Sequence, residues 1–160
     1  MAGAQLIAPP VRVIVLHRRN EPPGQCTLTP FRRAPRADLT IVDWPLSAPL
    51  ELPGDALLLH VDGLPLAVTD APATIVLIDT TWSKVGGVLR ALPADLRRRS
   101  LPRGAQTAFP NVSKQGRDPA GGLATVEAIF LATSQLGARD ERWLAHYAHR
   151  DRFLARNARP

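Results

Sequence analysis

The feature that most constrains the fold is a run of five β-branched or aliphatic residues that ends abruptly in polar side chains. The run covers residues 74–78, and it is followed at once by Asp79, Thr80, Thr81 and Trp82. A continuous apolar run of this length is typical of a strand that is buried on both faces of a parallel sheet. Residues 83–92 then show the spacing of an amphipathic helix, so the sequence predicts a buried strand that leads directly into a helix.

Asp79 is the acid that this pattern places best for chemistry. Ligands of open α/β sheets bind beyond the carboxyl ends of the strands, which is where the predicted strand delivers Asp79 and Trp82. A purely structural interpretation stays open beside the functional one. In that interpretation Asp79 or Thr81 caps the following helix, and Trp82 belongs to the core.

Other segments extend the alternation of strands and helices along the chain. Apolar runs at residues 11–16, 39–42 and 55–61 predict three more strands, and a turn-forming Asp-Gly pair follows the last of them. A helix is predicted over residues 123–137, and a final helix begins at Asp140. Strands that alternate with helices indicate the α/β class, with a mostly parallel sheet and flanking helices.

The charge balance favours a polyanionic partner. The chain has 20 Lys and Arg against 14 Asp and Glu, which is a net charge of +6, and nearly all of the positive charge is Arg. Arg forms bidentate contacts with phosphate and stacks on bases. A solvated charged loop is the competing interpretation of each cluster, and GC-rich coding alone also raises the Arg content. The side chains that we expect to contact RNA are Arg18, Arg19, Arg32, Arg33, Arg97, Arg98, Arg99, Arg103 and Lys114.

Several classes of protein are disfavoured by what the sequence lacks. Cys26 is the only cysteine, so the chain can form neither an internal disulfide nor a thiolate zinc site, in keeping with a reducing cytoplasm. The first residues lack the pattern of a signal peptide, and no apolar run is long enough to cross a bilayer. We therefore expect a cytoplasmic protein without a membrane partner. Rossmann, P-loop, H-E-x-x-H and G-x-S-x-G motifs are not found.

Three further polar features carry weaker signals. The four histidines are scattered, although His146 and His149 lie three apart on the predicted final helix and could form a metal pair. Cys26 could be a nucleophile, but it stands alone in a Pro- and Gly-rich loop. Glu127 is a second candidate carboxylate, whose structural role would be to favour the N-terminus of its helix. We expect no metal ion.

The order of motifs along the chain resembles that of the 3-amino-3-carboxypropyl transferases. This superfamily includes rRNA aminocarboxypropyltransferases and the DTW-domain tRNA-uridine enzymes. Residues 79–82 resemble its D-x-[ST]-W signature, residues 101–102 its Leu-Pro step, and residues 123–128 its L-S-x-x-E-A segment. Residues 109–117 are similar to its A-N-P-x-N-Y-G-x-P loop, and residues 153–157 are similar to its F-L-x-x-N ending.

The resemblance implies a SPOUT-like α/β fold with a C-terminal trefoil knot, and S-adenosyl-L-methionine as the cofactor. By position, Asp79 would orient or deprotonate the N–H of a uridine-type base. Residues 1–70 would form an N-terminal α/β portion with RNA-facing loops and residues 71–160 the cofactor-binding portion, unless both form one compact unit. The side chains that would border the cofactor are Leu59, Thr81, Trp82, Leu101, Leu123 and Thr125.

We therefore expect a monomeric RNA-modifying transferase. It would move the 3-amino-3-carboxypropyl group of S-adenosylmethionine to a uridine or pseudouridine-type base, with rRNA favoured over tRNA. Two alternatives stay open: a SPOUT-type RNA methyltransferase, and a non-catalytic RNA-binding protein that keeps the fold and the basic surface. The by-product separates the two enzymes, because aminocarboxypropyl transfer releases methylthioadenosine and methyl transfer releases S-adenosylhomocysteine.

Overall fold

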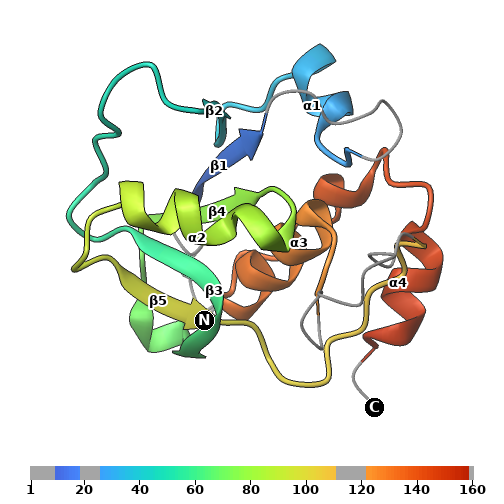
Figure 1. Ribbon diagram of the computed structural model, residues 1–160. Coiled ribbons are helices and arrows are strands. Elements are labelled where there is room, and N and C mark those ends of the chain that lie inside the picture. Colours follow the sequence, from blue (N-terminus) through green and yellow to red (C-terminus); the bar gives the residue numbers. More distant parts are fainter. Residues whose placement is uncertain (1–9, 19–25, 111–121, 159–160) are drawn as a thin grey trace, which may run out of the picture.

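A five-stranded, all-parallel sheet forms the centre of the molecule (Figure 1). The computed structural model describes residues 10–18, 26–110 and 122–158. The strands stand in the order β2-β1-β4-β3-β5. Their bounds are β1 (Arg12–Arg18), β2 (Leu39–Trp44), β3 (Leu57–Pro65), β4 (Thr74–Asp79) and β5 (Arg97–Ser100). The predicted α/β class with a parallel sheet is therefore confirmed.

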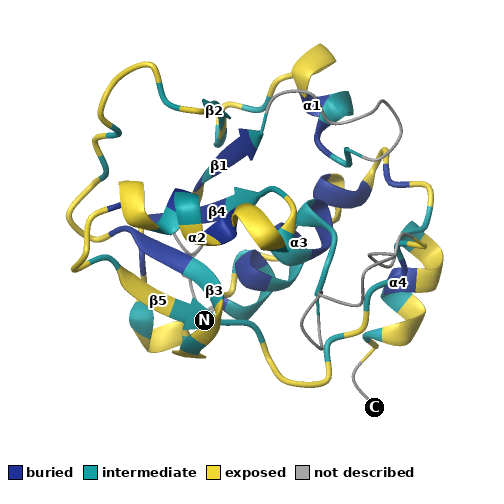
Figure 2. Ribbon diagram, viewed as in Figure 1, coloured by how far each residue is buried: buried dark blue, intermediate teal, exposed yellow. Residues whose placement is uncertain are grey.

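The inner strands β1 and β4 divide the core into two layers. Val13 and Val15 of β1 belong to a large hydrophobic cluster on one face, which also takes in α3 (Thr125–Gln135). Leu16 of β1 belongs to a second cluster on the other face, which takes in α2 (Trp82–Ala91). Successive side chains of a strand point to opposite faces, so a continuous apolar run supplies both layers. Figure 2 shows the resulting burial of these two strands.

The two predicted helices with a clear 3.6-residue pattern are present as α2 and α3. The final helix is different, because the chain from Asp140 does not form one helix. It forms a 3₁₀ turn, η2 (Glu141–Leu144), and then a separate helix, α4 (Arg150–Arg156). The Asp140 carboxylate accepts the backbone N–H of Arg142 at 2.9 Å and is also bound by Arg36 at 2.8 Å. These bonds favour a tight turn at that position.

Three smaller elements complete the fold. A short helix, α1 (Thr29–Arg33), places Phe31 in the core, and a 3₁₀ turn, η1 (Val68–Asp70), precedes β4. The Asp-Gly pair predicted to be a turn lies instead inside β3, where the pairing register with β5 shifts. A side chain at Gly63 would place its Cβ 2.6 Å from the backbone nitrogen of Arg99, so the two strands approach closely there.

The sheet joins the two portions of the chain that were delimited from the sequence. Strands β1, β2 and β3 come from residues 1–70 and strands β4 and β5 from residues 71–160, and β4 lies between β1 and β3. The division itself stays a prediction. Among the helices of the described residues, none has both the length and the apolar character needed to span a membrane.

Candidate functional site

His17 and Asp79 meet where the connections of the sheet diverge. The chain leaves β1 toward β2 on one side and leaves β4 through α2 toward β5 on the other. Such a switch point opens a crevice beyond the carboxyl ends of the two strands. The parallel register pairs His17 with Asp79 near the ends of β1 and β4. Asp79 therefore lies at the predicted edge, but with a histidine partner that the sequence analysis did not assign.

The two side chains form a shielded hydrogen-bonded pair. Nδ1 of His17 lies 3.0 Å from Oδ2 of Asp79, and the side chains are only 8% and 16% exposed. The hydrogen bond to Asp79, and after it the hydrogen bond with Cys26, raises the pKa of His17 to about 10 against the opposing effect of burial. His17 is therefore an imidazolium at neutral pH, and its hydrogen bond to Oδ2 holds the Asp79 side chain in one orientation.

Cys26 continues this pair toward the surface. Its Sγ lies 3.9 Å from Nε2 of His17. Burial opposes ionisation of the Cys26 thiol, but hydrogen bonds from His17, the backbone of Leu28 and the side chain of Thr29 together lower its pKa below the ordinary value. The side-chain ligand atoms of Cys26, His17 and Asp79 all lie within 4.8 Å of one another. We refer to these three residues as the Cys–His–Asp triad.

The triad is arranged as a chain of hydrogen bonds. Thiolate, imidazole and carboxylate are all metal ligands in other proteins. Here, however, Cys26 and Asp79 approach opposite nitrogens of the His17 ring. Coordination of one ion would require the three donor atoms to converge on a common point. The geometry instead corresponds to an imidazolium that Asp79 orients at Nδ1 and that contacts a thiol at Nε2.

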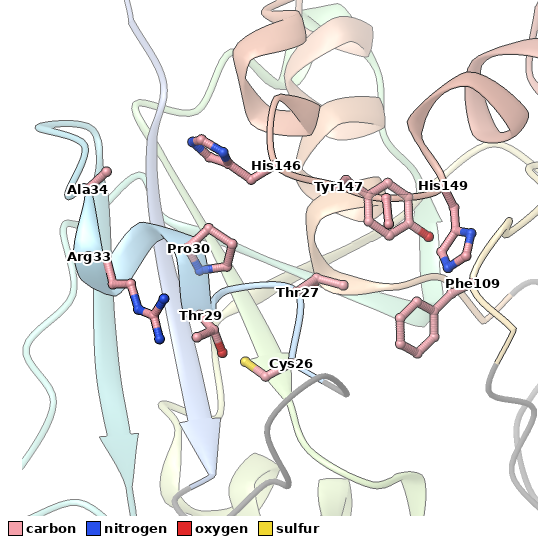
Figure 3. Close-up of a pocket in the computed structure, with 11 residues that line it drawn as sticks. Cys26, Thr27, Thr29, Pro30, Arg33, Ala34, Phe109, His146, Tyr147 and His149 are labelled. Carbon is pink, nitrogen blue, oxygen red and sulfur yellow. The ribbon is translucent and has the colours of Figure 1, made fainter.

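Cys26 also lines a pocket of about 510 Å³, which Figure 3 shows in close-up. The aromatic wall of the pocket consists of Phe109 stacked on Tyr147, with ring centroids 6.5 Å apart, and His149 edge-on to both rings. His146 and His149 line this pocket, and the prediction that they share the final helix is wrong, because α4 begins only at Arg150. The remaining lining residues are Thr27, Thr29, Pro30, Arg33, Ala34 and Ala148.

The residues after Asp79 bear on the structural interpretation of this junction, in which they cap α2 or belong to the core. Thr81 occupies the N-cap position of α2, but its side chain makes no capping hydrogen bond. The Thr80 hydroxyl is buried and has no hydrogen-bond partner within the described part of the chain. Trp82 is only partly buried, and among the described residues neither hydrophobic cluster includes it. Neither a satisfied helix cap nor a core tryptophan therefore accounts for these side chains.

The other side chains expected at the cofactor lie on both sides of this junction. Leu59, Leu101 and Leu123 are partly buried against the hydrophobic cluster on the α3 face. Thr125 is the first residue of α3 and is half-buried. Thr81 and Trp82 begin α2, which covers the other face.

Glu127, the second candidate carboxylate, has a structural role. Its side chain is fully buried. One oxygen accepts the Ala108 N–H at 2.8 Å and the Tyr147 hydroxyl at 2.7 Å, and the other accepts Thr107 Oγ1 at 2.7 Å and the Ala124 N–H at 2.9 Å. Burial and this bond to Glu127 raise the pKa of Tyr147. Glu127 thus fixes the N-terminus of α3 and the 101–110 segment.

The basic residues that were predicted to contact RNA differ in whether an acidic side chain already binds them. Arg97, Arg98 and Arg99 form most of the edge strand β5, where Arg99 binds Asp70 at 2.8 Å and Arg98 contacts Asp62 at 3.2 Å. Arg32 binds Asp43 at 2.7 Å. Arg19 and Lys114 lie outside the described residues. Those without an ion pair to another described residue are Arg18, Arg33 and Arg103.

Sequence reasoning missed His17 and gave Cys26 little weight, although a signal was present. His17 follows the buried run at residues 11–16 just as Asp79 follows the run at residues 74–78. Two central parallel strands that both end in a titratable residue present them at one edge of the sheet. The distances along the chain conceal this proximity, because His17 and Asp79 are 62 positions apart.

Comparison with known proteins gives one informative result. A scan against protein-family models and a search of curated protein sequences found no match. Among solved structures, the chain is similar to the SAM-dependent rRNA:acp-transferase Tsr3 from Vulcanisaeta distributa, with a TM-score of 0.65 and 21% sequence identity. The similarity covers 92% of this chain and 79% of that one. That protein belongs to the same class of enzyme that the sequence motifs resemble, and the likeness establishes that the two chains share a fold.

Proposed function

We propose that this protein transfers the 3-amino-3-carboxypropyl group of S-adenosylmethionine to a uridine or pseudouridine-type base of RNA, with rRNA favoured. The observation that carries the proposal is the position of Asp79. It is a shielded carboxylate, paired with His17, at the switch point of a sheet whose fold is shared with an rRNA:acp-transferase. The SPOUT-like assignment and the trefoil knot belong to the same proposal.

The residues around Asp79 suit S-adenosylmethionine in two respects. The buried Thr80 hydroxyl lacks a partner among the described residues, so a polar group of a ligand would satisfy it. Leu59, Leu101 and Leu123 offer partly buried apolar surface on one side of the edge, which suits a largely apolar pocket wall. In this proposal they would hold the cofactor together with Thr81, Trp82 and Thr125. When bound, S-adenosylmethionine supplies a carbon that its sulfonium activates for transfer.

The protein's own contribution is to position the nucleobase that receives the transferred group and to remove its N–H proton. Oδ2 of Asp79 is bound to His17, which leaves Oδ1 to accept the N–H proton of the base. The hydrogen bond from the His17 imidazolium fixes the direction of this side chain, so Asp79 needs no reorganisation during the reaction. Arg18 and Arg33, which form no ion pair with another described residue, would bind phosphates near this edge.

The proposal is tested by incubating the purified protein with S-adenosylmethionine and rRNA or tRNA, followed by mass spectrometry of the nucleosides and the by-product. We expect an aminocarboxypropylated nucleoside together with methylthioadenosine. The Asp79→Asn variant keeps the size of the side chain but removes the carboxylate that accepts the proton of the nucleobase. It should lose at least about 100-fold in transfer rate. Calorimetry should show that this variant still binds S-adenosylmethionine.

Three other outcomes would each contradict a different part of the proposal. Release of S-adenosylhomocysteine would show a methyltransferase. Binding of RNA without binding of S-adenosylmethionine at millimolar concentration would show a non-catalytic RNA-binding protein. Full transfer activity in Asp79→Asn would remove Asp79 from the reaction while leaving the class of enzyme intact.

A further inference from the structure

The Cys–His–Asp triad has the composition and connectivity of a nucleophilic site, which aminocarboxypropyl transfer does not require. Asp79 contacts Nδ1 of His17 at 3.0 Å, and Nε2 of the same ring faces Cys26 Sγ at 3.9 Å. The hydrogen bond at Nδ1 fixes the orientation of the ring, so that Nε2 is directed at the thiol. The three residues come from separate segments of the chain, and the parallel register of β1 and β4 brings two of them together.

Cys26 also lies at the pocket. It is partly buried and is one of the residues that line the pocket of about 510 Å³, where Figure 3 shows its sulfur on the side of Thr29 and Arg33. The hydrogen-bonding groups that face Cys26 favour a negative charge on sulfur, against the opposing effects of burial and of Asp79. On the inner side they are His17 and the donors at Leu28 and Thr29. Across the pocket, Arg33 adds a guanidinium, and the titratable groups are His146, Tyr147 and His149. The carboxyl group of Asp79 lies within 4.8 Å of the sulfur. His17 contacts both Asp79 and Cys26 directly.

We propose that Cys26 is a reactive nucleophile, activated by His17 and Asp79, that forms a covalent bond with an alkylating carbon of a small molecule bound in this pocket. In this step the thiolate electron pair forms the Sγ–C bond. The bond between that carbon and its leaving group breaks, and the leaving group departs with the bonding pair. The proton stays on His17, or passes from Nε2 to the leaving group where that group is basic.

This inference goes beyond the proposed transfer, although both involve Asp79. An adduct on Cys26 would lie within 4.8 Å of the Asp79 carboxylate, so it should also block transfer. The reactivity of the thiol is measured without S-adenosylmethionine or RNA. Failure of one proposal is therefore distinguishable from failure of the other.

The test uses iodoacetamide as the alkylating probe and intact-protein mass spectrometry as the readout. Because Cys26 is the only cysteine, one carbamidomethyl adduct reports on this thiol alone. Alkylation rates are measured from about pH 5 to about pH 9.5, and the midpoint of the pH profile gives the ionisation of the thiol. The same chain in urea is the internal reference, with an expected midpoint of about 8.5 for a free thiol.

We expect the folded protein to have a midpoint at least about one pH unit below that of the unfolded chain. The variant His17→Gln should move the midpoint back toward the unfolded value, because His17 is the largest of the groups that lower the pKa of the thiol. The matched control is His60→Gln, which removes a histidine that is also bonded to an aspartate, Asp62, but is not part of the triad. This control should leave the midpoint unchanged.

Two results would overturn the proposal. One is a folded-state midpoint equal to that of the unfolded chain, which would mean that His17 does not activate the thiol. The other is a Cys26 that iodoacetamide does not modify at any pH while the chain is folded, which would mean that the pocket does not admit a ligand to the sulfur. If His17→Gln does not fold, the comparison of folded with unfolded wild-type protein still decides the question.

Discussion

The contact between His17 and Asp79 makes the stability of the protein depend on pH in a defined direction. The pKa of His17 rises from 6.5 to about 10 on folding, chiefly because Asp79 binds it. A raised folded-state pKa means that the stabilisation is complete below about pH 6.5 and is lost as the pH rises through about 10. The pair therefore stabilises the fold most on the acidic side of neutrality.

We expect the difference in unfolding free energy between the wild-type protein and His17→Gln to shrink by roughly 2–5 kcal/mol between about pH 6 and about pH 10. Urea denaturation at several pH values measures this difference. Both proteins should carry Cys26→Ser, so that titration of the thiol does not contribute. A difference that stays constant with pH would show that folding does not raise the pKa of His17.

Glu127 is the second residue whose contacts permit a sharp prediction. Its carboxylate accepts four hydrogen bonds and is fully buried, and an amide of the same size can accept at only one of its two terminal atoms. Glu127→Gln should therefore lose about 2–4 kcal/mol of stability, because at least one buried donor is left unpaired. Tyr147→Phe removes only one of the four donors and should lose about 1 kcal/mol. Equal losses in the two variants would show that Glu127 does not organise the 101–110 segment.

At the scale of elements, the close approach of β3 and β5 depends on the absence of a side chain at Gly63. Gly63→Ala would bring a methyl group to 2.6 Å from the Arg99 backbone nitrogen, and backbone cannot yield as a side chain does. We expect a loss of about 1–3 kcal/mol in denaturant titrations. Gly54→Ala is the matched control, since a methyl there meets nothing within 4 Å. If both variants had the same stability, the edge strand would be free to shift.

The elements also show how far local pattern predicts this fold. The helices α2 and α3 were predicted nearly to their ends, because their apolar spacing depends only on neighbours in the sequence. The break after Leu144 was not predicted, since it depends on Arg36, which binds Asp140 from 104 positions away. The strand character of the arginines in β5 was missed for the same reason, because pairing with β3 determines it.

The candidate site, like the fold, was predictable only where it depends on a local sequence pattern. A local pattern, an apolar run that ends in an acid, was enough to select Asp79. Its partner His17 was not selected, because sheet register brings the two together and register is a long-range property. The pocket beside Cys26 was also beyond reach, since Phe109, Tyr147 and His149 come from segments whose proximity only the packed molecule shows.

At the scale of the whole molecule, the net charge of +6 should appear as a salt-dependent affinity for RNA. We expect Arg33→Gln to weaken binding and to lower the slope of log affinity against log salt by about 1, as for the loss of one phosphate contact. Arg99→Gln is the comparison variant, and its effect should be smaller because Asp70 already neutralises that guanidinium at 2.8 Å. A larger effect at Arg99 would place the RNA along the β5 edge.

The central position of β1 has a consequence for the newborn chain. Asp79 of β4 follows His17 of β1 by 62 positions, so at about 5–20 residues per second the ribosome takes about 3–12 seconds to supply the strand that covers one edge of β1. During that interval an apolar strand with an unpaired edge is exposed to other nascent chains. Chaperones that bind extended apolar segments should therefore engage this protein early, and slower translation between β1 and β4 should lower the yield of soluble protein.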